Sequence, residues 1–180
     1  DEEYSAQNLE GNLVLINGNI LNCDLKAFFS NKEKIKFTVI SKNDEKITIL
    51  FSDKARPFVK RYKFIKGFSD GTLDFYSVKN KGKSDSILKI YDFKLKEVPA
   101  LTKLLTLASL QGIADLLTGE GIRFDEFEMK FNDKASLITI NEIYGIGPAI
   151  SILMDGYIEK NKLVSLRGTL VPATTINKAI

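Results

Sequence analysis

Chemistry in this sequence would have to come from carboxylates and one cysteine, because the 180 residues contain no histidine. Without histidine, Ser-His-Asp and Cys-His catalysis and zinc sites built from histidine and cysteine are excluded. Asp125, Glu126 and Glu128 lie close together in the sequence. Strand alternation would put Asp125 on the face opposite Glu126 and Glu128. They are therefore poor candidates for a convergent acid–base pair, and we interpret them as part of a solvated strand face.

Two other motifs also favour structure over chemistry. The segment GIGPAI at 145–150 resembles a dinucleotide-binding loop only superficially, because Pro148 interrupts it, the third glycine is missing and a strand pattern follows. We predict a turn or bulge there, and no cofactor. Cys23 is the only cysteine, so no disulfide can form within the chain, and we interpret it as a small buried apolar residue.

The charge of the chain is mildly basic, with a net charge of +3 and a pI near 8.8. Most of the basic residues are lysines spread along strands and turns, which is typical of a solvated outer face. Contact with anionic lipid head groups is the alternative. Arginine is not clustered and no RNA-binding aromatic pattern occurs, so no nucleic-acid partner is expected.

Period-2 alternation of apolar and polar residues is the dominant pattern and predicts a mainly β fold. Short polar turns, such as Asn17-Gly18, join the runs, which recur every 10–14 residues. We therefore predict an antiparallel meander forming a curved sheet or β-groove, in one domain over residues 1–180. The segment 95–99 divides it into halves, 1–96 and 97–180. The expected strands are 13–16, 19–21, 36–40, 46–51, 71–78, 87–95, 122–131, 136–142, 149–158 and 163–170.

A helical hairpin is predicted as an insert near 98–118. Apolar residues there follow helical spacing, Pro99 suits a first helical turn, and Gly112 is expected to mark the joint between two short helices. The stretch also contains Lys103 and Asp115, which argues against a membrane span. A second, short helix is expected within 53–65. The residues expected to pack the hairpin are Leu101, Leu104, Leu105, Ala108, Leu110, Ile113 and Leu117.

Several strands are apolar on one face and polar or charged on the other, and such a face must be covered by protein or by lipid. One helical hairpin is a small cover for about ten strands, so we predict an uncovered apolar groove. A closed sandwich or sealed core is the alternative. The expected groove residues are Phe127, Met129, Phe131, Ile138, Ile140, Ile150, Ile152 and Met154.

Several segments carry a resemblance to a known family, in the same order and spacing. They are IKGFSDGTL at 65–73, YDFKL at 91–95, LLTLASLQGI at 104–113, GEGIRF at 119–124 and GTLVPA at 168–173 with Asn177. This pattern resembles the C-terminal region of the AsmA-like family, most of all its YhdP-type members. The sequence departs from the family in being rich in lysine, isoleucine and asparagine, and it ends before the family's terminal segments.

The resemblance implies a non-catalytic segment of a longer Gram-negative envelope protein, periplasmic and anchored in the inner membrane. Such a protein conducts phospholipid between the inner and outer membranes along an apolar β-groove. Its expected partners are phospholipid acyl chains and envelope membrane proteins. A structural or interaction module for envelope or outer-membrane assembly is the alternative, and an enzyme that uses carboxylates alone is a third, weaker one.

Overall fold

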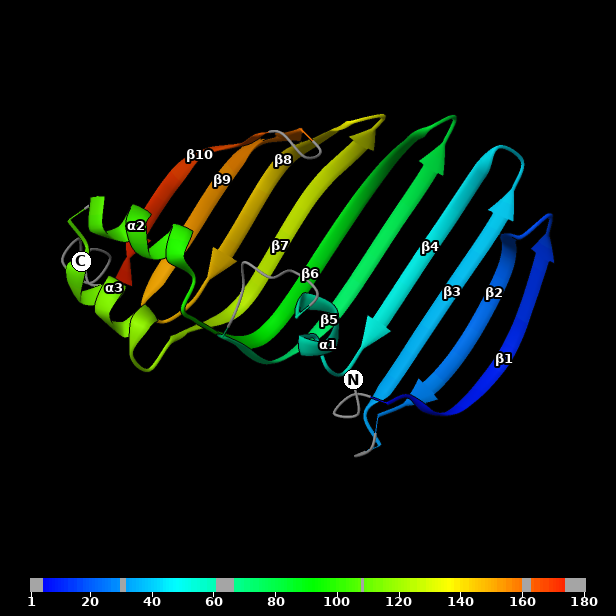
Figure 1. Ribbon diagram of the computed structural model, residues 1–180, viewed down its shortest axis with the longest axis horizontal. Coiled ribbons are helices and arrows are strands. Elements are labelled where there is room, and N and C mark those ends of the chain that lie inside the picture. Colours follow the sequence, from blue (N-terminus) through cyan, green and yellow to red (C-terminus); the bar gives the residue numbers. More distant parts are fainter. Residues whose placement is uncertain (1–4, 30–31, 61–66, 108, 160–162, 174–180) are drawn as a thin grey trace.

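The computed structural model describes residues 5–29, 32–60, 67–107, 109–159 and 163–173. They form one ten-stranded antiparallel sheet in which every strand pairs with its sequence neighbours, in the order β1 to β10 (Figure 1). The mainly β meander predicted from alternation is therefore confirmed. The strands are β1 (Gln7–Ile16), β2 (Asn19–Phe28), β3 (Lys34–Lys42), β4 (Glu45–Ser52), β5 (Gly67–Asn80), β6 (Lys83–Lys96), β7 (Ile122–Lys134), β8 (Leu137–Ile146), β9 (Ile150–Glu159) and β10 (Leu163–Pro172).

Tight turns follow from residues that accept a left-handed backbone. Between β1 and β2, Asn17 and Gly18 have φ of 50° and 75°, and between β5 and β6, Lys81 and Gly82 have φ of 45° and 82°. Two successive positive φ values are what a two-residue hairpin needs to match the twist of its strands. The predicted Asn17-Gly18 turn is thus confirmed.

Three helices accompany the sheet, α1 (Arg56–Val59), α2 (Pro99–Leu107) and α3 (Gln111–Thr118). The hairpin predicted near 98–118 is confirmed as α2 and α3, and Pro99 opens α2 as expected. Of the short helix expected within 53–65, the described part is α1, and residues 61–66 lie outside the described ranges.

The joint of the hairpin is not at Gly112, and that prediction is wrong. Ser109 adopts a left-handed φ of 58°, its N–H donates to the Thr106 carbonyl at 3.0 Å, and the Leu110 N–H donates to the Leu105 carbonyl at 2.8 Å. This hydrogen-bond pair is a Schellman ending, which stops α2 before α3 begins. Gly112 lies inside α3, with open space where a side chain would be.

The main core lies at one end of the sheet, between the strands and the helices that cover them (Figure 1). Phe68, Phe93 and Phe124 stack across β5, β6 and β7, with ring centroids 5.2 and 5.4 Å apart. The other buried members of the cluster are Ala55, Val59, Leu73, Ile90, Leu105, Ala114, Leu117, Ile122 and Ile150.

The period-2 alternation breaks where β5, β6 and β7 enter this core. Asp70, Gly71 and Asp92 have φ of 62°, 82° and 52°, and the ladder between β5 and β6 skips the Gly71–Asp92 level. Extra residues of this kind bend a strand and shift which residues face inward. The three strands curve at this end (Figure 1), where the helices pack against them.

Candidate functional site

The cross-strand register gathers apolar side chains into rows that run across one face of the sheet, which we call the apolar face. The central row crosses all ten strands without a polar residue. Its members are Gly11, Leu25, Phe37, Leu50, Phe75, Leu88, Met129, Ile143, Met154 and Gly168. Adjacent strands lie about 4.8 Å apart, so this row is about 43 Å long.

The lower row lies two residues nearer the helices and runs from β2 to β10. It is apolar except for one serine, whose hydroxyl donates to the Lys54 carbonyl at 2.7 Å. Its members are Ala27, Ile35, Ser52, Leu73, Ile90, Phe127, Gly145, Ile152 and Leu170.

The upper row, on the other side of the central row, is apolar at both ends and polar in the middle. Its members, from β1 to β10, are Leu13, Cys23, Val39, Thr48, Ser77, Ser86, Phe131, Ile140, Gly156 and Leu166. The Ser86 hydroxyl donates to the Ser77 hydroxyl at 2.8 Å. Three neighbouring strands therefore place hydroxyls side by side.

The apolar face is well buried at β2 and β3. Val39 is only 2% exposed and Cys23 only 3%, although no described helix lies over β2 and β3. Neighbouring residues, rather than a described helix, therefore bury these two side chains. The interpretation of Cys23 as a buried apolar residue is confirmed, and burial, with the neighbouring Asp24 carboxylate, raises the pKa of its thiol.

All eight residues predicted to line the groove lie on the apolar face. Phe127 and Ile152 belong to the lower row, Met129 and Met154 to the central row, and Phe131 and Ile140 to the upper row. Ile138 pairs with Asp133 and Ile158 one step beyond the upper row. These seven side chains are buried or half-buried, and Phe127 and Ile152 also pack against the core cluster.

Ile150 is the exception among the predicted groove residues. It shares the apolar face but is fully buried in the core cluster beneath the hairpin, so it does not line the open part of the face. The helices cover only the end of the strands where Ile150 lies (Figure 1).

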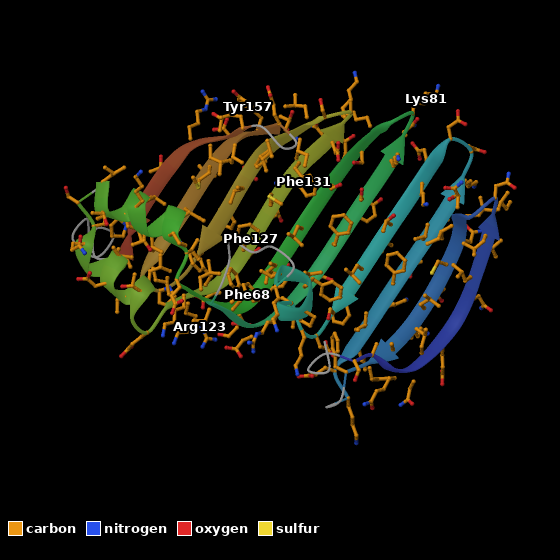
Figure 2. The ribbon with its side chains drawn as sticks, viewed as in Figure 1. Phe68, Lys81, Arg123, Phe127, Phe131 and Tyr157 are labelled. Carbon is orange, nitrogen blue, oxygen red and sulfur yellow. The ribbon has the colours of Figure 1, made fainter. Side chains whose placement is uncertain are left out.

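The residues predicted to pack the hairpin mostly lie against the same cluster. Leu105 and Leu117 are fully buried, while Leu101, Leu110 and Ile113 are half-buried against it. The Leu104 side chain and Ala108 lie outside what the structure describes. The hairpin therefore closes one end of the apolar face, and no described helix covers the part of the face beyond that end (Figures 1 and 2).

Sequence reasoning missed the contribution of the first half of the sheet. Leu25, Phe37, Leu50, Phe75 and Leu88 extend the central row across β2 to β6. Alternation in KIKFTVI at 34–40 and TLDFYSV at 72–78 carried that signal. The cluster of three hydroxyls on Thr48, Ser77 and Ser86 could not be found in this way, because only the strand register brings these residues together.

The opposite face, which we call the polar face, carries ion pairs. Glu128 accepts from Lys89 at 2.6 Å and from Lys130 at 2.9 Å, and Lys130 also reaches Glu142 at 2.9 Å. The hydrogen bonds from Lys89 and then Lys130 hold the pKa of Glu128 below its usual range. Glu128 is thus engaged in structural pairs.

Asp125 lies at the strand bend. The Arg123 guanidinium lies 3.7 Å from the Asp125 carboxylate and 3.2 Å from the Asp92 carboxylate. The Arg123 side chain points away from the sheet at its lower edge (Figure 2). The two ion networks separate Asp125 from Glu128, so these carboxylates do not converge on a common point. Residues 147–149 form the β8–β9 turn, closed by the Gly147 N–H donating to the Ile150 carbonyl at 3.0 Å, so the turn predicted within 145–150 is present.

The polar face also has an open hollow of about 560 Å³ at the β8–β10 end. Its wall includes Asp155, whose carboxylate is held by a bidentate Arg167 guanidinium at 3.0–3.1 Å, and Tyr157 (Figure 2). A carboxylate neutralised in this way is a poor base. Among the described residues, no group of three or more carboxylate, cysteine or histidine side chains could hold a metal ion.

No helix in the described ranges is both long enough and apolar enough to cross a membrane. In comparisons with known proteins, no family model, curated protein or solved structure matches this chain.

Proposed function

We propose that the apolar face binds phospholipid acyl chains and that the chain is a segment of a conduit that passes phospholipid between the inner and outer membranes of a Gram-negative envelope. The observation that carries the proposal is the central row, which offers apolar side chains from β2 to β9 and a glycine at each end, without a polar interruption. The sequence resemblance to AsmA-like proteins supports the envelope setting, a periplasmic location, inner-membrane anchoring and envelope protein partners.

The physics of acyl-chain binding suits such a surface. Each methylene removed from water contributes ~0.8 kcal/mol, and the contribution needs no directional contact. Successive strands present similar apolar groups, so a chain shifted by one strand finds a similar environment. Binding sites of nearly equal affinity allow movement along the row, and no single side chain should be indispensable.

The polar face carries charged residues that suit the solvated side of such a segment. Ion pairs such as Lys89–Glu128 and Arg167–Asp155 lie on that side, together with exposed apolar side chains such as Ile49 and Leu153. A sheet with one polar and one apolar face can hold acyl chains on the one while the other stays solvated.

A non-catalytic structural or interaction module for envelope assembly is the second candidate. The sealed cluster beneath α2 and α3 favours it, because Leu105, Leu117 and Ile150 are fully buried there by protein alone. In this alternative the rest of the apolar face would be covered by another protein.

Native mass spectrometry after mild purification tests the proposal, with an opposite-face pair of variants as the control. Ile143 belongs to the central row, and its sequence neighbour Tyr144 lies on the polar face. We expect phospholipid adducts on the wild-type chain and on Tyr144→Asp, and strongly reduced adducts on Ile143→Asp. A folded wild-type chain that carries no phospholipid after exposure to phospholipid vesicles would favour the structural module.

A further inference from the structure

The apolar face carries one polar notch, which we define as Thr48, Ser77 and Ser86 with Lys46 and Lys79. Thr48, Ser77 and Ser86 are cross-strand neighbours in the upper row. Lys46 and Lys79 lie on the same face two residues further from the helices and are direct cross-strand partners. On β4 and β5 the face therefore changes from apolar to hydroxyl to cationic over two steps along the strands, while β6 carries Ser86 and then Ser84.

The hydroxyls have hydrogen-bonding capacity that the described chain does not use. Ser86 is buried and donates to Ser77 at 2.8 Å. This leaves the Ser77 proton available, and the Thr48 hydroxyl has no partner among the described residues. A hydroxyl has one donor and two acceptor positions, so the notch can donate to an anionic oxygen placed above it.

The lysine pair adds a positive charge at the same place. Like charges directly opposite each other in a ladder disfavour the sheet unless solvent or an anion lies between them. Within the described ranges, neither ammonium has a carboxylate within ion-pair distance. Along their row the next side chains are Ser84 and then Asp133, so the first carboxylate on this face lies two strands from Lys79, about 10 Å away.

A cross-strand lysine pair is not unique to the notch, because the polar face has one as well. Lys26 and Lys36 are also direct cross-strand partners, but they lie on the polar face and are exposed to water. What distinguishes Lys46 and Lys79 is their place on the apolar face, next to hydroxyls and two steps from the central row.

We propose that the notch seats the phosphate of a phospholipid whose acyl chains lie on the central and lower rows, an inference that rests on the proposed function. The hydroxyls of the notch lie one step, about 7 Å along a strand, from the central row, and the lysines lie two steps from it. One phospholipid can therefore place its head group in the notch and its acyl chains on the row. Ser77 and Thr48 donate to the phosphate oxygens, and the two ammonium groups neutralise the charge. The notch spans three strands, so it seats one head group at a fixed position along an otherwise uniform row.

Equilibrium binding of two fluorescent lipids with the same acyl chains tests this proposal. One is phosphatidylglycerol and the other is diacylglycerol, which lacks the phosphate. We expect the full chain to bind phosphatidylglycerol about tenfold more tightly. Lys46→Gln with Lys79→Gln should abolish that preference while leaving diacylglycerol binding unchanged, and retained diacylglycerol binding also shows that the variant is folded.

Two further variants sharpen the comparison. Lys26→Gln with Lys36→Gln makes the same charge change on the polar face and should keep the preference. Thr48→Val keeps the side-chain size and Ser77→Ala removes only the hydroxyl, so the pair removes both donors and should reduce the preference several-fold. If the Lys46/Lys79 variant keeps the full preference, the notch proposal is wrong while lipid binding stands.

Two other results would distinguish a lipid phosphate from free phosphate, and a failure of the notch proposal from a failure of the proposed function. Inorganic phosphate alone, titrated by calorimetry, should bind far more weakly than the lipid, and equal binding would overturn a lipid head group as the occupant. If the wild-type chain binds neither lipid, the proposed function itself fails, and the notch proposal fails with it.

Discussion

The rings of Phe93 and Phe124 stack across β6 and β7 with their centroids 5.4 Å apart and their planes 12° apart. Phe124 is fully buried under the helical hairpin, whereas Phe131, on the same strand and the same face, is only half-buried beyond it. Phe124 thus lies in the covered end of the apolar face, and Phe131 lies in the part that no described helix covers.

This difference predicts unequal costs for the same truncation. Phe124→Ala should lower the free energy of unfolding by about 3–5 kcal/mol, because it removes a stacked ring and leaves a cavity. Phe131→Ala should cost clearly less, since its ring has no helix above it. Urea denaturation of both variants measures the two values, and equal losses would mean that the upper row is sealed as tightly as the core.

The hairpin provides a second matched pair. Leu105 is 0% exposed and Leu107 is 73% exposed, although both lie on α2. Leu105→Asp places an unpaired charge in the core and should cost several kcal/mol, with a large drop in melting temperature. Leu107→Asp should change the melting temperature little. An unchanged melting temperature for Leu105→Asp would show that the hairpin does not dock on the sheet.

The Glu128 pairs predict a pH dependence of stability. Hydrogen bonds from Lys89 and Lys130 depress the pKa of Glu128 in the folded chain below the ordinary value of 4.5. The folded state then holds its proton less tightly, so the pairs stabilise the fold above about pH 4.5 and lose that effect as the pH falls through the depressed value.

Glu128→Gln isolates this contribution. The variant should be less stable than the wild type at pH 7 by at most about 1 kcal/mol, as ion pairs near the surface usually give. The gap should narrow steadily below about pH 4.5. Chemical denaturation at several pH values measures it, and a gap that stays constant down to pH 2 would contradict the assigned pairs.

Local patterns in the sequence were enough to locate the ten strands, the Asn17-Gly18 turn and the hairpin, because each depends on residues close together in the chain. The expected strands 13–16 and 19–21 covered only part of β1 and β2. The alternation Phe127-Glu128-Met129-Lys130-Phe131 puts the three apolar residues on one face, as expected. The helix joint was misplaced at Gly112 because glycine marks an ending only where the backbone needs it, and here Ser109 takes the left-handed position.

Features that depend on the register between strands could not be predicted from the sequence. The phase shift around Gly71 and Asp92 is set by bends shared between strands, and no single strand reveals it. The alignment of Thr48, Ser77 and Ser86 likewise needs two ladders to be in step. Ile150 was assigned to the groove because its strand phase is right, but the position of the hairpin above it could not be read from that phase.

Photo-crosslinking from two neighbouring positions tests the central claim most directly. Met154 lies in the central row of the apolar face, and Leu153 next to it lies on the polar face and is 53% exposed. A photoreactive residue is placed at either position in the full chain, which is then irradiated with phosphatidylethanolamine and phosphatidylglycerol vesicles. We expect phospholipid adducts from position 154 and few or none from position 153. Equal capture from both positions, or protein-only crosslinks from position 154, would contradict acyl-chain binding by the apolar face.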